Sequence, residues 1–173
     1  MSLGDKDLIP YADRRASNWA AELDTLARER DLLIVVSAGN AKSPWGRNLD
    51  AIITAYPGYL TTPENRIIDP ATAANVITVG ALAHANGLHD GVDGPQVQHV
   101  ADRNEPSPIT RSGPGIGGAI KPEFCDYGGT VIFDGHTNSL QHGKDVASAG
   151  VVTLEPEYRR SLFIFLLGLV ALP

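Results

Sequence analysis

The stretch Leu32-Leu-Ile-Val-Val-Ser-Ala-Gly-Asn40 decides the fold. Its apolar run from Leu32 to Val36 is too short for a helix and is typical of a strand covered on both faces, as in a parallel sheet. Small and polar residues from Ser37 to Asn40 follow at once. Because ligands of open α/β sheets bind beyond the carboxyl ends of the strands, we expect these four residues to lie at a functional edge.

An amphipathic helix is predicted before this strand, from Tyr11 to Arg30. Small and apolar residues, Trp19 among them, recur there at three- and four-residue spacing, with charged residues on the other face. A second strand, rich in β-branched residues, is predicted from Asn75 to Ala81. A helix that leads directly into a strand is half of a βαβ unit, so the sequence predicts an α/β fold with a parallel sheet.

Residues 41–70 are rich in Pro, Gly and aromatic side chains, which predicts a long loop with one short helix from Asn48 to Thr54. Long loops are often functional, so Trp45 and Tyr56 are candidates to line a substrate cleft, with simple packing as the alternative. Further short strands are predicted at 130–133 and 151–154. The apolar segment 161–173 is shorter than the ~20 residues that cross a bilayer, so we expect a core element there.

Composition narrows the function classes. The 173 residues suit one domain, and 20 acidic against 14 basic residues give a net charge of −6. Without a basic stripe, nucleic acid is not an expected partner. Cys125 is the single cysteine, which excludes an internal disulfide or a CxxC motif and favours a small buried hydrophobe. No signal-peptide pattern follows Met1, and the compartment stays open.

Three segments, taken together and in order, resemble the subtilisin-like serine peptidases, the subtilases. Ser37-Ala-Gly-Asn40 after an apolar strand is similar to the oxyanion-asparagine motif of that family. Pro70-Ala-Thr-Ala-Ala-Asn-Val-Ile-Thr-Val-Gly-Ala81 is similar to its P-A-x-x-x-N-V-I-T-V-G-A segment. Pro106-Ser-Pro-Ile-Thr-Arg-Ser-Gly-Pro-Gly115, followed by Ala119-Ile-Lys-Pro-Glu-Phe-Cys-Asp-Tyr-Gly-Gly129, resembles its S-x-x-G-P and K-P-[DE] segments. The likeness runs from about the first helix to Phe133.

The resemblance implies a three-layer α/β/α fold, a peptide or protein substrate, and a role for each residue of the motif. Asn40 would donate its amide to the oxyanion, while Ser37, Ala38 and Gly39 would wall the specificity pocket and pair with the substrate backbone. Read from the residues alone, Asn40 has another interpretation, as a helix cap or a left-handed turn residue.

A serine peptidase also needs a nucleophile, a base and a group that orients the base. Subtilases carry the Asp and a His-Gly-Thr motif upstream of the oxyanion Asn, and a Gly-Thr-Ser motif downstream. Neither upstream motif lies in the ten residues before the predicted helix, and His142-Gly-Lys144 falls on the wrong side of Asn40. The end, Gly168-Leu-Val-Ala-Leu-Pro173, has no serine. We therefore expect residues 1–173 to be a single partial domain, the middle to late part of the catalytic domain, inactive alone.

Other readings stay open. A subtilase-like module that lost its triad would bind peptide or protein without catalysis. Gly113 to Gly118 spells GxGxxG, but no strand leads into it, so nucleotide binding is the weaker hypothesis. Histidines and aspartates between 82 and 105 have irregular spacings, so no metal site is predicted. Subtilases often bind calcium, yet no calcium loop matches here. An incomplete sheet also leaves strand edges for self-association.

Overall fold

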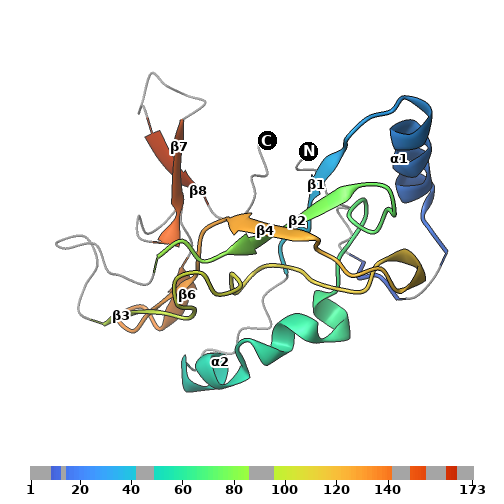
Figure 1. Cartoon of the computed structure of the whole chain (residues 1–173). Coiled ribbons are helices and arrows are strands. Elements are labelled where there is room, and N and C mark those ends of the chain that lie inside the picture. Colours follow the sequence, from blue (N-terminus) through green and yellow to red (C-terminus); the bar gives the residue numbers. More distant parts are fainter. Residues whose placement is uncertain are drawn as a thin grey trace.

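The computed structural model describes residues 9–12, 15–41, 49–85, 96–141, 149–154 and 163–166. The α-helices lie in the first part of these residues, and strands predominate from Ile77 onward (Figure 1). The elements, in chain order, are α1 (Asn18–Glu29), β1 (Val35–Ser37), α2 (Leu49–Ala55), the 3-10 helices η1 (Gly58–Thr61) and η2 (Pro63–Asn65), β2 (Ile77–Leu82), β3 (Val97–His99), the 3-10 helix η3 (Ile116–Gly118), β4 (Phe124–Tyr127), β5 (Ile132–Asp134), β6 (Ser139–Gln141), β7 (Val151–Leu154) and β8 (Phe163–Leu166).

A parallel sheet of order β1-β2-β4 lies at the centre (Figure 1). Its register places Val36 beside Thr78 and Gly80 beside Cys125. The prediction that the two apolar stretches run side by side in parallel is therefore confirmed. An antiparallel sheet, β3-β5-β6, and an antiparallel pair, β7-β8, accompany it in the described residues. The fold is therefore mixed α/β. It contains antiparallel strands in addition to the parallel sheet that the sequence predicts.

Helix α1 begins at Asn18 because Ser17 caps it: the Ser17 hydroxyl accepts a hydrogen bond from the Ala20 N–H at 3.0 Å. The predicted start at Tyr11 is thus wrong, since the chain around Tyr11 is extended and pairs with Ile67 instead. The helix buries Ala20, Leu23 and Ala27. Trp19 belongs to the apolar spacing of the helix, from which a core position is the simplest expectation, but it is 36% exposed and that expectation is wrong.

The main core lies between α1 and the first two strands. Side chains from α1, from β1 with its exit turn, and from the segment before β2 form one buried cluster: Tyr11, Ala20, Leu23, Val36, Ala38, Ile67, Ala71, Ala73 and Val76. Asp24 fastens the helix to this segment, because its carboxylate accepts the backbone N–H groups of Ala74 and Asn75 at 3.0 and 2.6 Å. The core thus fixes where β1 ends.

Strand β1 is shorter and less covered than the apolar run suggests. Leu32 and Leu33 lie outside the strand and are exposed, Leu33 to 78%. Within the strand, Val36 is buried while Val35 is exposed. Because side chains of a strand alternate between its faces, the exposed Val35 shows that one face of β1 is open in the described residues. The expectation of a strand covered on both faces is wrong.

The other predicted elements fare unevenly. Helix α2 and strands β5 and β7 lie within two residues of their predicted positions, whereas β3, β4 and β6 were not predicted. Cys125 belongs to β4, whose four side chains are all exposed, so its predicted burial is wrong. Strand β8 falls inside the apolar segment 161–173, and the predicted core position of that segment lies outside what the structure describes. Trp45 also lies outside the described residues. Helices in the described ranges are too short or too polar to span a membrane.

An ion pair joins β2 to the start of β4. The buried Lys121 ammonium lies 2.6 Å from a Glu123 carboxylate oxygen and donates to the Val76 carbonyl at 2.8 Å. The other Glu123 oxygen accepts the Thr78 N–H at 2.8 Å. Partial burial raises the pKa of Glu123, but the hydrogen bonds from Lys121 and the backbone, with the Lys121 charge, outweigh it and hold that pKa below its usual value.

This depressed pKa predicts a loss of stability in acid. A carboxylate with a lowered folded-state pKa stabilises the fold above its unfolded-state pKa of about 4.5, and that contribution disappears as the pH falls through the folded-state pKa. Glu123→Gln should therefore lower the free energy of unfolding at neutral pH, and the difference from wild type should shrink in acid. Urea titrations across this pH range measure it, with exposed Glu22→Gln as the control. A pH-independent difference would contradict the assignment.

Candidate functional site

The exit of β1 is a turn built from the four residues predicted to carry function. Ala38 still pairs with the sheet, its N–H donating to the Val79 carbonyl at 2.8 Å. The Ser37 hydroxyl then accepts the Gly39 N–H at 3.1 Å, which closes a local turn. Gly39 has a φ of +87°, a conformation that glycine adopts without strain. The chain therefore leaves the sheet sharply at Gly39.

Exposure differs along the turn. Ala38 is 1% exposed and belongs to the core cluster, while Ser37 and Gly39 are half-buried. Asn40 is exposed and does not belong to the core. The left-handed conformation belongs to Gly39 and not to Asn40, and Asn40 instead forms an antiparallel bridge with Thr110. Its left-handed-turn interpretation is therefore wrong.

The segment 109–111 holds this turn through the backbone. Ala41 N–H donates to the Ile109 carbonyl at 2.7 Å, and Arg111 N–H donates to the Gly39 carbonyl at 3.2 Å. Two of the segments that carry the family resemblance, about 70 residues apart, are thus hydrogen-bonded to each other.

Arg111 is a residue that sequence reasoning did not single out. Its side chain is buried, the residue being 1% exposed. Nε donates to the Asn40 carbonyl at 2.8 Å, and one terminal nitrogen donates to the carbonyls of Arg66 and Glu64 at 2.8 and 3.2 Å. Burial lowers the pKa of the guanidinium. In the sequence, Arg111 is marked only by its position in the third segment that resembles the subtilases. That position does not distinguish Arg111 from its neighbours in the segment.

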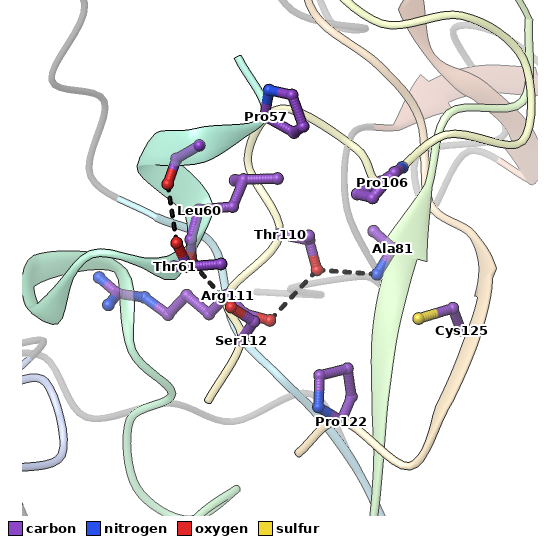
Figure 2. A pocket seen from close by; sticks show the side chains of 11 residues that line it. Pro57, Leu60, Thr61, Ala81, Pro106, Thr110, Arg111, Ser112, Pro122 and Cys125 are labelled. Carbon is purple, nitrogen blue, oxygen red and sulfur yellow. Dashed lines mark hydrogen bonds between the residues drawn. The ribbon is translucent and has the colours of Figure 1, made fainter. Parts of the chain in front are cut away.

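On the other side of residues 110–112 lies an apolar cavity of about 360 Å³ (Figure 2). It opens between η1 and the strands β2 and β4, with Pro122 and Cys125 on its wall. Thr110 borders it, and the Thr110 hydroxyl accepts the Ala81 N–H at 3.0 Å. None of the residues from Ser37 to Asn40 lines this cavity.

The remaining candidates do not form a site in the described ranges. The Tyr56 hydroxyl donates to the Pro106 carbonyl at 2.7 Å, which fits packing rather than an open cleft. Gly113 to Gly118 leads into a 3-10 turn rather than an α-helix and follows no described strand, so the nucleotide-binding arrangement is not formed. The described residues contain no group of three His, Cys, Asp or Glu side chains that could hold a metal, and no calcium site is assigned. His89 lies outside them.

Comparison with known proteins shows the family of the chain. The model of the subtilase family matches residues 1–157, and the chain belongs to that family. It is similar to the uncharacterized protein y4bN of Sinorhizobium fredii (strain NBRC 101917 / NGR234), with 46% identity over 164 residues. The match covers 94% of this chain and 38% of that protein, so the chain spans well under half the length of its relative. No solved structure matches the chain significantly.

The turn geometry predicts that Gly39 tolerates substitution worse than another left-handed glycine. A Cβ on Gly39 would lie 3.3 Å from Ile68 and 3.4 Å from Arg111, whereas one on Gly117, with a φ of +66°, would meet nothing within 4 Å. Gly117→Ala should cost about 1–2 kcal/mol through backbone conformation alone. Gly39→Ala should cost about 1–3 kcal/mol more through overpacking. Denaturant unfolding measures both, and equal costs would contradict the tight packing at the turn.

Proposed function

We propose that residues 1–173 form the middle-to-late part of the catalytic domain of a subtilisin-like serine endopeptidase, and that this part is inactive alone. The observation that carries the proposal is the turn after β1. Its asparagine is exposed, follows a parallel strand, and is held on both sides by backbone hydrogen bonds. Family membership and the coverage of 38% of the relative support a partial domain of a longer protein.

In the proposed reaction a serine of the parent enzyme attacks the peptide carbonyl, and the negative charge that develops on its oxygen needs a fixed donor. The Asn40 amide supplies an uncharged N–H for that oxygen. Its backbone is already fixed, so little reorganisation accompanies the charge. Asn40 is thus the group of this chain that acts on the transition state.

Ser37, Ala38 and Gly39 have the role of a pocket wall in this proposal. The Ala38 side chain packs in the core, so its contribution to the substrate is made through the backbone. Ile68 and Arg111 fill the space that a Gly39 side chain would take, so the contact of Gly39 with the substrate is also made through the backbone. These residues bind and orient the substrate residue before the cut, while Asn40 acts on the carbonyl itself.

The proposal extends to the architecture. The sheet β1-β2-β4 is the described portion of a larger parallel sheet in a three-layer α/β/α domain. The remaining strands of that sheet, the triad Asp and His, and the nucleophilic Ser come from elsewhere in the parent protein. Self-association through the outer strands remains a prediction for the chain on its own.

Labelling with a fluorophosphonate probe tests the proposed activity. The 173-residue chain should not react, because it carries the oxyanion donor without its nucleophile, while the parent protein should label at one serine and cleave casein. Labelling of the short chain would contradict the partial-domain proposal. A parent protein that binds peptides but neither labels nor cleaves would establish the alternative, a non-catalytic binding module.

In the parent enzyme, Asn40→Ala should lower kcat by roughly 10²- to 10³-fold with little change in KM, the magnitude known for such an amide in subtilisin itself. Asn18→Ala, on the exposed start of α1, is the control and should leave both constants unchanged. Equal kcat values for the two variants would remove Asn40 from the reaction.

A further inference from the structure

The two peptide planes that flank the Asn40 Cα are both held in place. The plane before it is fixed where the Gly39 carbonyl accepts the Arg111 main-chain N–H at 3.2 Å. The plane after it is fixed at both ends, by the Arg111 Nε on the Asn40 carbonyl at 2.8 Å and by the Ala41 N–H on the Ile109 carbonyl at 2.7 Å. Because peptide units are planar, fixing both planes fixes the direction of the Asn40 Cα–Cβ bond.

Arg111 supplies two of these three bonds and ties them to a second segment. The same guanidinium donates to the Arg66 and Glu64 carbonyls at 2.8 and 3.2 Å, next to the end of η2. These carbonyls and that of Asn40 are its hydrogen-bond partners among the described residues, and no described carboxylate pairs with it. A buried cation solvated by carbonyl dipoles alone keeps those dipoles in place, since moving one away removes part of its solvation.

Packing on the turn supports the same role. The arginine stem passes over Gly39, because the position of a Gly39 Cβ would be only 3.4 Å from the Arg111 Cδ. The missing side chain at Gly39 therefore makes room for the arginine as well as allowing the turn.

We propose that Arg111 is the positioning residue of this site: its buried guanidinium and main-chain N–H lock the backbone on either side of Asn40 and so set the direction in which the Asn40 side chain leaves the chain. The positioning itself follows from the contacts above, and only its consequence for catalysis rests on the proposed function. A guanidinium is suited to it because its donors are held in one plane, whereas a lysine ammonium is a compact, rotating donor that cannot reach the same carbonyls in a fixed fork.

The unmodified chain gives the first test. In an NMR exchange experiment on the 173-residue chain, the Arg111 Nε–H proton should exchange with solvent at least roughly tenfold more slowly than those of the exposed Arg28 and Arg30, and should show a through-bond coupling to the Asn40 carbonyl carbon. Equal exchange rates without that coupling would overturn the proposal, whatever any variant does.

Substitution gives the second test. Arg111→Lys keeps the charge and should speed amide exchange at Ala41 at least roughly tenfold, while the Leu32 N–H, bonded to the Ala27 carbonyl at the end of α1, should not change. Arg28→Lys, on the exposed face of α1, is the matched control and should change neither. Unaltered exchange at Ala41 in a folded Arg111→Lys protein would overturn the proposal.

Kinetics of the parent enzyme separate this inference from the proposed function. Arg111→Lys should lower kcat about 10- to 100-fold, as expected for a misplaced catalytic group, and change KM little. If Asn40→Ala leaves kcat unchanged while the exchange experiments succeed, the proposed function fails and the positioning role stands. If Asn40→Ala lowers kcat but Arg111→Lys behaves as wild type in exchange and in kcat, the positioning role fails alone.

Discussion

Three backbone segments, far apart in the sequence, meet around the guanidinium of Arg111, and the geometry at the exit of β1 depends on that meeting. The turn 39–41 and the stretch 64–66 each bond to the segment 109–113 through main-chain groups, and the Arg111 side chain links the two. Losing these carbonyls would leave a buried ion unsolvated, at an effective cost of several kcal/mol. The constraint is therefore strong, and it acts on the backbone at Asn40.

Two buried cations serve the sheet in different ways. Lys121 is paired with Glu123 just before β4, so this ion pair is lost when the Glu123 carboxylate takes up a proton. Arg111 is held by carbonyls, which do not titrate, and its own charge persists at any pH that a folded protein tolerates. The entrance to β4 is consequently acid-sensitive, whereas the Asn40 turn responds to acid only through the loss of the fold. In the enzyme proposed above, this separation would keep the backbone at Asn40 in place across the pH range in which the catalytic base titrates.

The sequence predicted the parts of the fold that burial pattern governs. Runs of apolar residues predicted β1 and β2 and their parallel pairing, although β1 is not covered on both faces as such runs suggest. Predictions failed where contacts with other segments determine the structure. Leu33 is exposed because the strand begins after it. Strand β4 has four exposed side chains, and its sequence shows no alternation of apolar and polar residues that would predict a strand. The start of α1 depended on the hydroxyl of Ser17, a local contact that apolar spacing does not record. Arg111 escaped notice because arginine is ordinarily a surface residue.

The central claim is that the Asn40 amide faces the oxygen of a reacting carbonyl. The most direct measurement is a crystal structure of the parent protein with a peptide boronate, a mimic of the tetrahedral intermediate, bound to its nucleophile. We expect the Asn40 Nδ2 within about 2.7–3.1 Å of the boronate oxygen, with residues 37–39 beside the bound side chain. A boronate held elsewhere, or an Asn40 side chain directed away from it, would contradict the account.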